Sequence, residues 1–338
     1  MKLLITGGAG FIGSNFIQYI LKKYPDYEIV NLDKLTYAGN LENLKSVEND
    51  PRYKFVRGDI LNAELVDYLM KDIDVVVHFA AESHVDRSIK DSDSFVRTNV
   101  LGTLTLLEAA KNHKVKRFHH ISTDEVFGSL ETRGHFHEES SYDPRSPYSA
   151  SKAASDHLVR AYWHTHGLPV TISNCSNNYG PYQFPEKLIP LFITNLMEGK
   201  RVPLYGDGMN IRDWIHVEDH NEAVDLILHR GQIGETYCVG AREEKTNKEI
   251  TELILRRMGF SPDMIQPVAD RAGHDRRYAV RPYKIMAELG WYPKVSFEEG
   301  IDRTIRWYTD NASWWRRVKT GDYQKYYQEQ YNNRGLVI

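Results

Sequence analysis

Short apolar segments alternate with longer amphipathic ones through the first half of the chain. Runs rich in Val, Ile and Phe predict strands at residues 2–6, 28–32, 54–57, 75–79, 117–122 and 170–174. Several of these runs are apolar throughout, which is typical of strands covered on both faces. Between them, apolar residues spaced three and four apart predict helices at residues 11–24, 63–71, 94–112 and 149–166. This alternation indicates an α/β fold with a doubly wound parallel sheet.

The pattern changes after about residue 180. Helices are predicted at residues 187–198, 217–228, 247–258 and 283–289, separated by loops in which Gly, Asp and Arg cluster. We therefore expect a first domain at residues 1–180 and a smaller C-terminal substrate-binding region, mainly residues 181–310, at the open end of the sheet. Segments near 215–240 are candidates to return to the first domain. The tail, residues 311–338, receives no assignment.

Composition excludes several classes of protein. The 338 residues are 41% hydrophobic and 12% aromatic, which is ample for a core and excludes a disordered chain. The formal charge of −3 argues against nucleic acid as the main partner. The apolar runs are too short to span a bilayer, and the first residues lack a signal-peptide layout. We expect no membrane partner, a cytoplasmic location, and two buried thiols at Cys175 and Cys238 rather than a disulfide.

A glycine triplet follows the first predicted strand. The segment TGGAGFIG places Gly7, Gly10 and Gly13 three residues apart, with Phe11 and Ile12 between the last two. Glycine permits the tight turn, the approach of backbone to a pyrophosphate and the close packing of helix on strand. With a strand before it and a helix after it, the triplet predicts a Rossmann-like dinucleotide site.

Acidic residues at the ends of the next two strands refine this site. Asp33 lies 20 positions after Gly13, where a carboxylate binds the adenosine ribose 2′-hydroxyl and repels a 2′-phosphate. NAD is therefore favoured over NADP. The lysine beside Asp33, Lys34, leaves NADP as the alternative. Asp59 and Ile60 follow the third strand, where an adenine ring could be held; the alternative for Asp59 is a turn residue or helix cap.

Tyr148 and Lys152 stand at positions i and i+4, so they share one face of a predicted helix. The ammonium of Lys152, together with a positive nicotinamide ring, would stabilise a tyrosinate. Both would lower the pKa of Tyr148 toward that of a general base. The alternative is a solvated helix face. After a dinucleotide loop and five strands, we favour the functional interpretation.

The fifth strand ends in Thr123, Asp124 and Glu125. Groups at the carboxyl ends of parallel strands face the ligand crevice of an open α/β sheet. Two adjoining carboxylates can divide into an acid and a base when their surroundings move their pKa values apart. The alternative for each of these residues is a helix N-cap.

Thr6–Gly13, Asp33 and the Tyr148/Lys152 pair resemble the extended short-chain dehydrogenase/reductase superfamily. Four further stretches resemble the dTDP-glucose 4,6-dehydratase family: DKLTYAGN at 33–40, AAESHVDRS at 80–88, TDE at 123–125 and NCSNNYGP at 174–181. The resemblance runs from residue 1 to about residue 300.

This resemblance implies a lyase that acts on dTDP-glucose with tightly held NAD. Tyr148 would remove the proton of the glucose 4-hydroxyl during oxidation at C4, with Thr123 bonded to that oxygen and Lys152 holding the tyrosinate. Glu125 would then take the C5 proton, and Asp124 would protonate the departing 6-hydroxyl. Hydride return to C6 completes a 4-keto-6-deoxy sugar. A homodimer is also implied, with residues 94–112 and 149–166 of two copies forming a four-helix bundle.

The resemblance also implies binding residues. Those on the NAD side are Ala80, Ala81, Thr98 and Asn178, and those facing the sugar are Ser83 and Asn177. The nucleotide-diphosphate site would comprise Lys187, Leu188, Pro203, Tyr205, Arg212, Asn247, Arg271 and His274. Two arginines suit a diphosphate, which prefers forked donors. Ala272 departs from the family's usual proline, for which we expect a modest effect on substrate affinity. No metal is expected.

Two alternatives stay open. One is another NAD-dependent enzyme of the superfamily, such as a UDP-sugar 4-epimerase or a decarboxylase, against which the pair Asp124 and Glu125 argues. The other is a non-catalytic NAD-binding scaffold.

Overall fold

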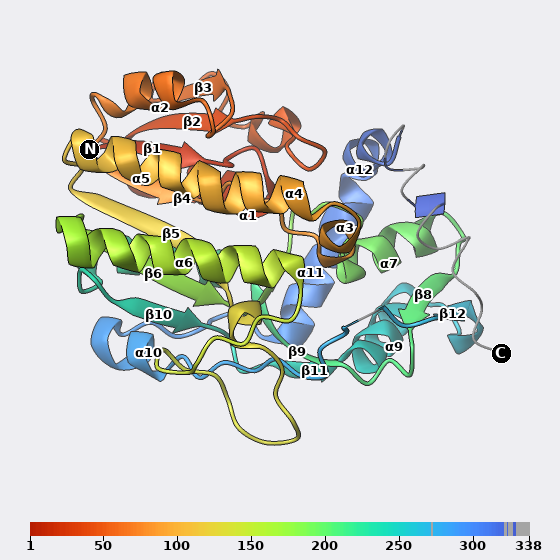
Figure 1. The fold of residues 1–338 in the computed structure, drawn as a ribbon. Coiled ribbons are helices and arrows are strands. Elements are labelled where there is room, and N and C mark those ends of the chain that lie inside the picture. The colour runs from red at the N-terminus through yellow and green to blue at the C-terminus, as the bar shows by residue number, and fades with distance from the viewer. Residues whose placement is uncertain (272, 321–322, 324–326, 329–338) are drawn as a thin grey trace.

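The computed structural model describes residues 1–271, 273–320, 323 and 327–328. Its centre is a seven-stranded sheet in the order β10–β6–β5–β4–β1–β2–β3, with every pair parallel (Figure 1). The strands are β1 (Lys2–Thr6), β2 (Glu28–Asp33), β3 (Tyr53–Arg57), β4 (Val75–His78), β5 (Arg117–Thr123), β6 (Val170–Cys175) and β10 (Thr236–Val239). The predicted α/β fold with a doubly wound parallel sheet is confirmed. Only β10 among these strands was not predicted, because it lies beyond the alternation of strands and helices in the first half of the chain.

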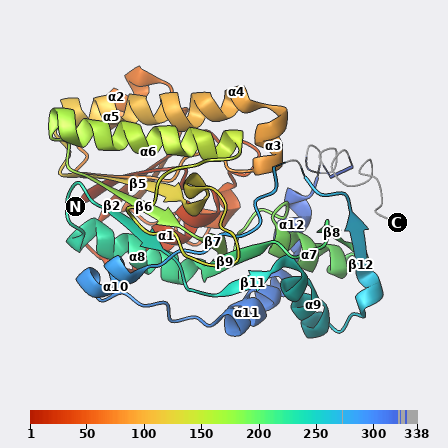
Figure 2. The same ribbon diagram turned by 60° about the horizontal axis from the view of Figure 1, so that its bottom comes forward.

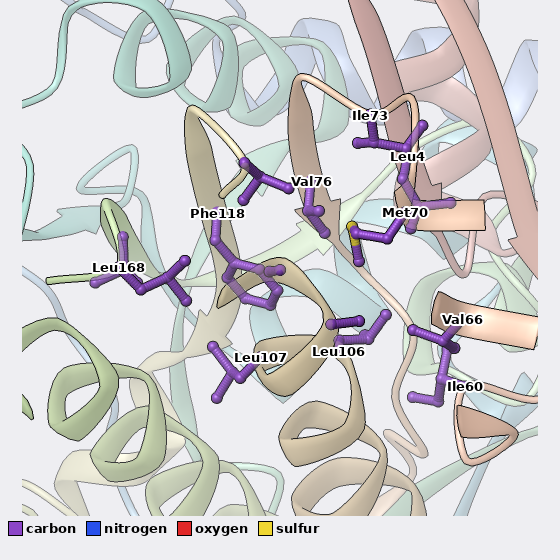
Figure 3. Close-up of a cluster of buried hydrophobic side chains, with 14 of the residues drawn as sticks. Leu4, Ile60, Val66, Met70, Ile73, Val76, Leu106, Leu107, Phe118 and Leu168 are labelled. Atoms are coloured by element: carbon purple, nitrogen blue, oxygen red, sulfur yellow. The ribbon is translucent and has the colours of Figure 1, made fainter. Parts of the chain in front are cut away.

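Helices cover both faces of the sheet (Figure 2). On one face, α2 (Ala63–Met70), α5 (Thr103–Asn112) and α6 (Pro147–His166) enclose a core in which Leu4, Val76 and Phe118 of the strands meet Leu106 and Leu107 of α5 (Figure 3). On the other face, α1 (Phe11–Lys23) and α8 (Val217–Arg230) pack over the strands. Because both faces are covered, even polar side chains of the central strands, such as His119 and His120 of β5, are buried.

The segment predicted as one helix at residues 94–112 is instead broken. Short helices α3 (Val85–Lys90) and α4 (Ser92–Phe95) are followed by a π-helical segment, Val96–Gly102, before α5 begins. The wider turns place Asn99 in the interior, where its side chain bonds both backbone groups of Glu82 and the hydroxyl of Ser151. Such π segments occur often at functional sites, and this one fixes the loop after β4.

The remaining elements gather beyond the carboxyl ends of the strands. A three-stranded sheet holds β7 (Asn177–Tyr179), β9 (Ile211–His216) and β11 (Glu244–Thr246), and β8 (Val202–Tyr205) pairs with β12 (Ile265–Val268). The predicted helices are confirmed as α7 (Leu188–Met197), α8, α9 (Asn247–Met258) and α10 (Tyr283–Leu289). The short strands between them were not predicted.

The C-terminal helices α11 (Phe297–Asp310) and α12 (Ala312–Val318) close the core of this second region. Tyr308, Trp314 and Trp315 are buried there against residues of α7 and α9. The tail is therefore packed as far as the structure describes it. No described helix combines the length and apolar character that a membrane crossing needs.

Candidate active site

The dinucleotide loop lies between β1 and the start of α1 at Phe11. Gly7 adopts a φ of +70°, and a Cβ there would stand 2.6 Å from backbone atoms of Ala80. A Cβ on Gly13 would stand 2.5 Å from the carbonyl oxygen of Gly7. Both positions therefore require glycine. The loop presents the backbone N–H groups of the helix N-terminus, which no side chain caps, to the opening above the sheet.

Asp33 ties the end of β2 to this loop. Its two carboxylate oxygens accept hydrogen bonds from the backbone N–H groups of Ala9 at 2.9 Å and Leu35 at 2.8 Å. Burial raises the pKa of Asp33, and these two bonds oppose the rise. Lys34 pairs with Asp59 at 2.7 Å, so its ammonium is held by a carboxylate of the same site. Asp59 also accepts a bond from the Leu61 N–H, as a turn residue does.

A hollow of about 470 Å³ runs from this loop along the strand ends. It is lined by every residue predicted to bind the cofactor: Gly7, Gly10, Phe11, Ile12, Gly13, Asp33, Lys34, Asp59, Ile60, Ala80, Ala81, Thr98, Tyr148, Lys152 and Asn178. A glycine cradle that a Cβ would fill, a helix N-terminus and a fixed carboxylate 20 residues later match the donor set that a dinucleotide needs. The residues present thus fit NAD.

Tyr148 and Lys152 lie on the first turns of α6, which Ser146 caps and Pro147 begins. Both side chains are buried, which excludes the solvated face. Lys152 Nζ donates to the carbonyl oxygen of Ile121 at 2.7 Å, and burial lowers the pKa of Lys152 to about 8.

The Tyr148 pKa is raised well above its usual value by burial and the nearby Glu125 carboxylate. The direction is thus opposite to the one expected from Lys152 and a positive nicotinamide ring. In the chain alone, burial and a nearby negative charge outweigh the ammonium.

Thr123 ends β5, and the next residues form a 3-10 turn, Asp124–Phe127. Thr123 Oγ1 accepts from the Glu125 N–H at 3.3 Å, so Thr123 does cap this turn. It also donates to Asp124 Oδ1 at 3.3 Å. Asp124 is fully buried and its Oδ2 has no hydrogen-bond partner among the described residues, whereas Glu125 is half-buried.

The two carboxyl groups differ in their surroundings. Burial, Glu125 and Asp213 all raise the pKa of Asp124, to well above its usual value. Burial also raises the pKa of Glu125, but Arg271, Lys187 and Arg212 oppose the rise. Asp124 therefore holds its proton more firmly than Glu125 does. This is the division into an acid and a base that adjoining carboxyl groups can achieve.

A second hollow, of about 160 Å³, adjoins the first. It is lined by all eight residues predicted for the nucleotide-diphosphate site: Lys187, Leu188, Pro203, Tyr205, Arg212, Asn247, Arg271 and His274. Glu125, Asn177 and Lys187 line both hollows, and Ser83 and Thr123 line the first. The Asp124–Glu125 pair thus lies where the two hollows meet. Ala272 lies outside the described residues.

Arginine and aromatic groups shape the second hollow. Arg212 is buried with its guanidinium 4.2 Å from the ring centroid of Tyr278, and it donates to the carbonyl oxygens of Asp275 and Ile211. Arg271 Nε is buried without a hydrogen-bond partner in the described part of the chain. Unused guanidinium donors in an enclosed site suit a diphosphate.

Some residues at the hollows were not predicted. Tyr37 lines the first hollow, and Arg87 behind it stacks on its ring with 3.8 Å between guanidinium carbon and ring centroid and donates from Nε to Glu186 at 3.0 Å. Glu186 lines both hollows, and Tyr278 lines the second. Arg87 and Tyr37 lie within the stretches that carry the resemblance, and Glu186 precedes Lys187. Their closeness in sequence to predicted site residues is the signal by which they could have been found.

Comparison with known proteins gives a consistent picture. The model of the family described as GDP-mannose 4,6 dehydratase matches residues 4–304. A dTDP-glucose 4,6-dehydratase of Streptomyces antibioticus is 55% identical over 94% of this chain and 96% of its own length. The Escherichia coli dTDP-glucose 4,6-dehydratase is 49% identical over 99% and 100%.

Solved structures of the same and related enzymes also resemble this chain. DesIV, a dTDP-glucose 4,6-dehydratase of Streptomyces venezuelae with NAD and TYD bound, superposes with a TM-score of 0.93 at 52% identity, covering 94% of this chain and 100% of that one. A Thermotoga maritima UDP-glucose 4-epimerase superposes with a TM-score of 0.86 at 28% identity, covering 92% and 100%.

Proposed function

Because this chain belongs to the nucleotide-sugar 4,6-dehydratase family, we propose that it converts dTDP-glucose into dTDP-4-keto-6-deoxyglucose and water. One observation carries the proposal. Asp124 and Glu125 adjoin beside Tyr148 at the junction of a dinucleotide hollow and an arginine-bearing hollow. Elimination of water needs an acid and a base in addition to the tyrosine that serves oxidation. A 4-epimerase has no use for this pair.

The first hollow would hold NAD, with the glycine loop at the pyrophosphate and Asp33 at the adenosine ribose. Bound there, NAD would supply the oxidation at C4 of the sugar and the later reduction at C6. Asp33 favours NAD over NADP because a 2′-phosphate would face its carboxylate. The other residues predicted to bind the cofactor, which also line this hollow, would supply the remaining contacts.

Tyr148, as phenolate, takes the proton of the sugar 4-hydroxyl. Burial makes the phenolate a strong base, since the pKa of Tyr148 is raised well above its usual value. Lys152, on the same helix face, supplies the positive charge that makes the phenolate attainable. Thr123 bonds the oxygen at C4 and keeps it beside Tyr148.

Oxidation at C4 acidifies the C5 proton, which Glu125 removes. Lys187, Arg212 and Arg271 oppose the rise in the pKa of Glu125, so it can ionise and serve as the base. Asp124 keeps its proton and delivers it to the departing 6-hydroxyl. Water leaves, and Glu125 returns its proton to C5.

We assign the diphosphate to Arg212 and Arg271, assisted by Lys187 and His274. The sugar would contact Ser83 and Asn177, and the nucleoside Leu188, Pro203, Tyr205 and Asn247. We infer that residues 1–180, with α8 and β10, mainly hold the cofactor and that residues 181–310 mainly hold the sugar nucleotide, to which Ser83 and Asn177 of the first part also contribute.

We also propose a cytoplasmic homodimer. Val96 and Leu101 of the π-helical segment, 47% and 44% exposed, are apolar side chains that the second copy would cover in a four-helix bundle. Cys175 and Cys238 are free buried thiols, as a reducing compartment allows. Light scattering coupled to size exclusion gives the mass; a monomer would contradict the dimer.

Mass spectrometry of the purified protein with dTDP-glucose, and separately with UDP-glucose, tests the function without added cofactor. We expect dTDP-glucose to lose one water, with NAD carried by the protein. Water loss from UDP-glucose alone would support the same reaction on a substrate with uracil in place of thymine. An unchanged mass with conversion to the galactose isomer would establish an epimerase. No reaction after NAD is added would favour a different sugar nucleotide or a scaffold.

A further inference from the structure

One turnover of the proposed reaction leaves two side chains in the wrong protonation state for the next. Tyr148 gains the proton of the 4-hydroxyl, and this proton does not return because the product is a ketone. Asp124 loses a proton to the departing 6-hydroxyl, and water carries it away. Glu125 takes the C5 proton and gives it back, so it ends as it began. One proton must therefore move from Tyr148 to Asp124 before another substrate reacts.

Thr123 stands between these two groups. Its Oγ1 donates to Asp124 Oδ1 at 3.3 Å, and a side-chain hydrogen bond with Thr123 lowers the pKa of Tyr148, against the larger effects of burial and Glu125. Catalytic hydrogen bonds are often this long before a ligand tightens the site. All three side chains are at most 8% exposed.

We infer that the Thr123 hydroxyl relays this proton from Tyr148 to Asp124 and so resets the acid and the base in one step. The inference rests on the proposed function and adds a second task for Thr123, performed after the sugar oxygen has left it.

The hydrogen-bond capacity of Thr123 fits this task. A hydroxyl has one donor and two acceptor sites. Thr123 accepts from the Glu125 N–H at 3.3 Å and donates to the Asp124 carboxylate, which leaves one acceptor site for a protonated phenol. In the relay the Tyr148 O–H bond breaks as a new O–H bond forms on Thr123. The original Thr123 O–H bond breaks as one forms on Asp124. No proton is exchanged with solvent, as the overall reaction requires.

The charges around the two groups oppose one another. Before the reset, the negative charge sits on Asp124 beside Glu125 and Asp213, and both raise its pKa. After the reset, the charge sits on Tyr148, whose pKa is also raised by burial and by Glu125; Lys152 on the same helix face and the positive nicotinamide ring of bound NAD would stabilise the phenolate there. Lys152 is itself a poor alternative acceptor, because its ammonium is already protonated near neutral pH and bonded to the Ile121 carbonyl oxygen.

The variants Thr123→Val and Thr123→Ser separate this relay from a mere positioning role. Valine preserves shape and removes the hydroxyl, whereas serine keeps it. Product formed per active site is followed by rapid quench with excess dTDP-glucose, and the single-turnover rate is measured with enzyme in excess. Circular dichroism establishes that both variants fold.

For T123V we expect one equivalent of product and then a steady rate about a hundredfold below its own single-turnover rate, the lower range for a positioned proton transfer. The slow phase should carry a normal solvent deuterium isotope effect, which product release would not. T123S should show no burst. Equal losses in the two rates of T123V, without a burst, would overturn the relay alone. Absence of water loss in the unmodified protein would instead reject the proposed function.

Discussion

Nε1 of Trp314 donates a hydrogen bond to Oδ1 of Asn43 at 2.9 Å and so joins residues 271 positions apart. The Nδ2 group of Asn43 in turn donates to the carbonyl oxygen of Ala9, in the dinucleotide loop. Arg317 of the C-terminal region pairs with Glu42 beside it. Helix α12 therefore supports the cofactor loop from the far end of the chain.

Replacing Trp314 by Phe should loosen this support. The buried Asn43 oxygen would lose its donor, at a cost of about 1–3 kcal/mol. We expect a lower melting temperature and less NAD retained per chain after purification. Trp307→Phe is the matched control, since Trp307 packs in the same cluster and no indole hydrogen bond of it is found among the described residues. Equal NAD retention in both variants would show that the Trp314–Asn43 bond does not support the cofactor loop.

The glycine loop predicts a contrast between two alanine variants. Gly7 and Gly199 both have positive φ, +70° and +68°, so each substitution carries similar backbone strain. A Cβ at Gly7 meets Ala80 backbone at 2.6 Å, whereas at Gly199 nothing lies within 4 Å. Gly7→Ala should abolish NAD retention, and Gly199→Ala should cost about 1 kcal/mol of stability and keep NAD. The test is the NAD content of each variant after gel filtration. Similar NAD content in both variants would show that the NAD site does not require glycine at position 7.

A charged brace between α1 and α8 predicts a pH dependence of stability. Asp225 is bonded by Lys23 at 2.6 Å and by His229 at 2.9 Å. The bond to Asp225 raises the pKa of His229. Burial alone would raise the pKa of Asp225, but the bonds from His229 and Lys23 hold it below its usual value.

The His229 contribution is therefore fully present below about pH 6.5, the unfolded value. It is lost as pH rises through the raised folded value. The Asp225 contribution is lost only in acid, as pH falls through its lowered pKa. His229→Gln should destabilise by roughly 1 kcal/mol near pH 5.5 and by less near pH 9, in urea unfolding. His164→Gln, at an exposed site, is the control; a constant difference across pH would disprove the brace.

The second hollow predicts that Arg212 cannot be exchanged for lysine. Its guanidinium bonds two backbone carbonyls and faces the Tyr278 ring, and lysine cannot reproduce this fork. Arg212→Lys should raise KM for dTDP-glucose roughly tenfold or more, since a charge-assisted hydrogen bond contributes about 1.5–3 kcal/mol. Arg276→Lys, in a surface pair with Asp207, should leave KM near normal. An unchanged KM for R212K would remove Arg212 from the diphosphate site.

The first six strands were predictable because short runs rich in Val, Ile and Phe alternate there with helical patterns. β10 and the strands of the second region were not, since they lie outside that alternation and depend on partners far along the chain. The glycine loop, Asp33 and the Asp124–Glu125 pair were visible as motifs. The raised pKa of Tyr148 was not, because it arises from burial and from a carboxylate on another element. The Arg87–Glu186 contact likewise exists only in the folded chain.

The division of labour between the carboxyl groups gives the last prediction. Glu125→Gln removes the group that takes the C5 proton but leaves Tyr148 and Thr123, which serve oxidation. Reduced nicotinamide should therefore accumulate on the protein while water loss falls roughly 10²–10⁴-fold. Asp124→Asn is the matched variant: Glu125 remains, so the C5 proton should exchange with solvent deuterium although water is not lost.

Absorbance of the reduced nicotinamide and the mass of the recovered sugar nucleotide separate these outcomes, with the exposed Glu131→Gln as control. Normal dehydration by E125Q would show that another group takes the C5 proton. Deuterium exchange in E125Q but not in D124N would reverse the two roles. Because burial, Glu125 and Asp213 raise the pKa of Asp124 while three cations oppose the rise at Glu125, we expect neither result.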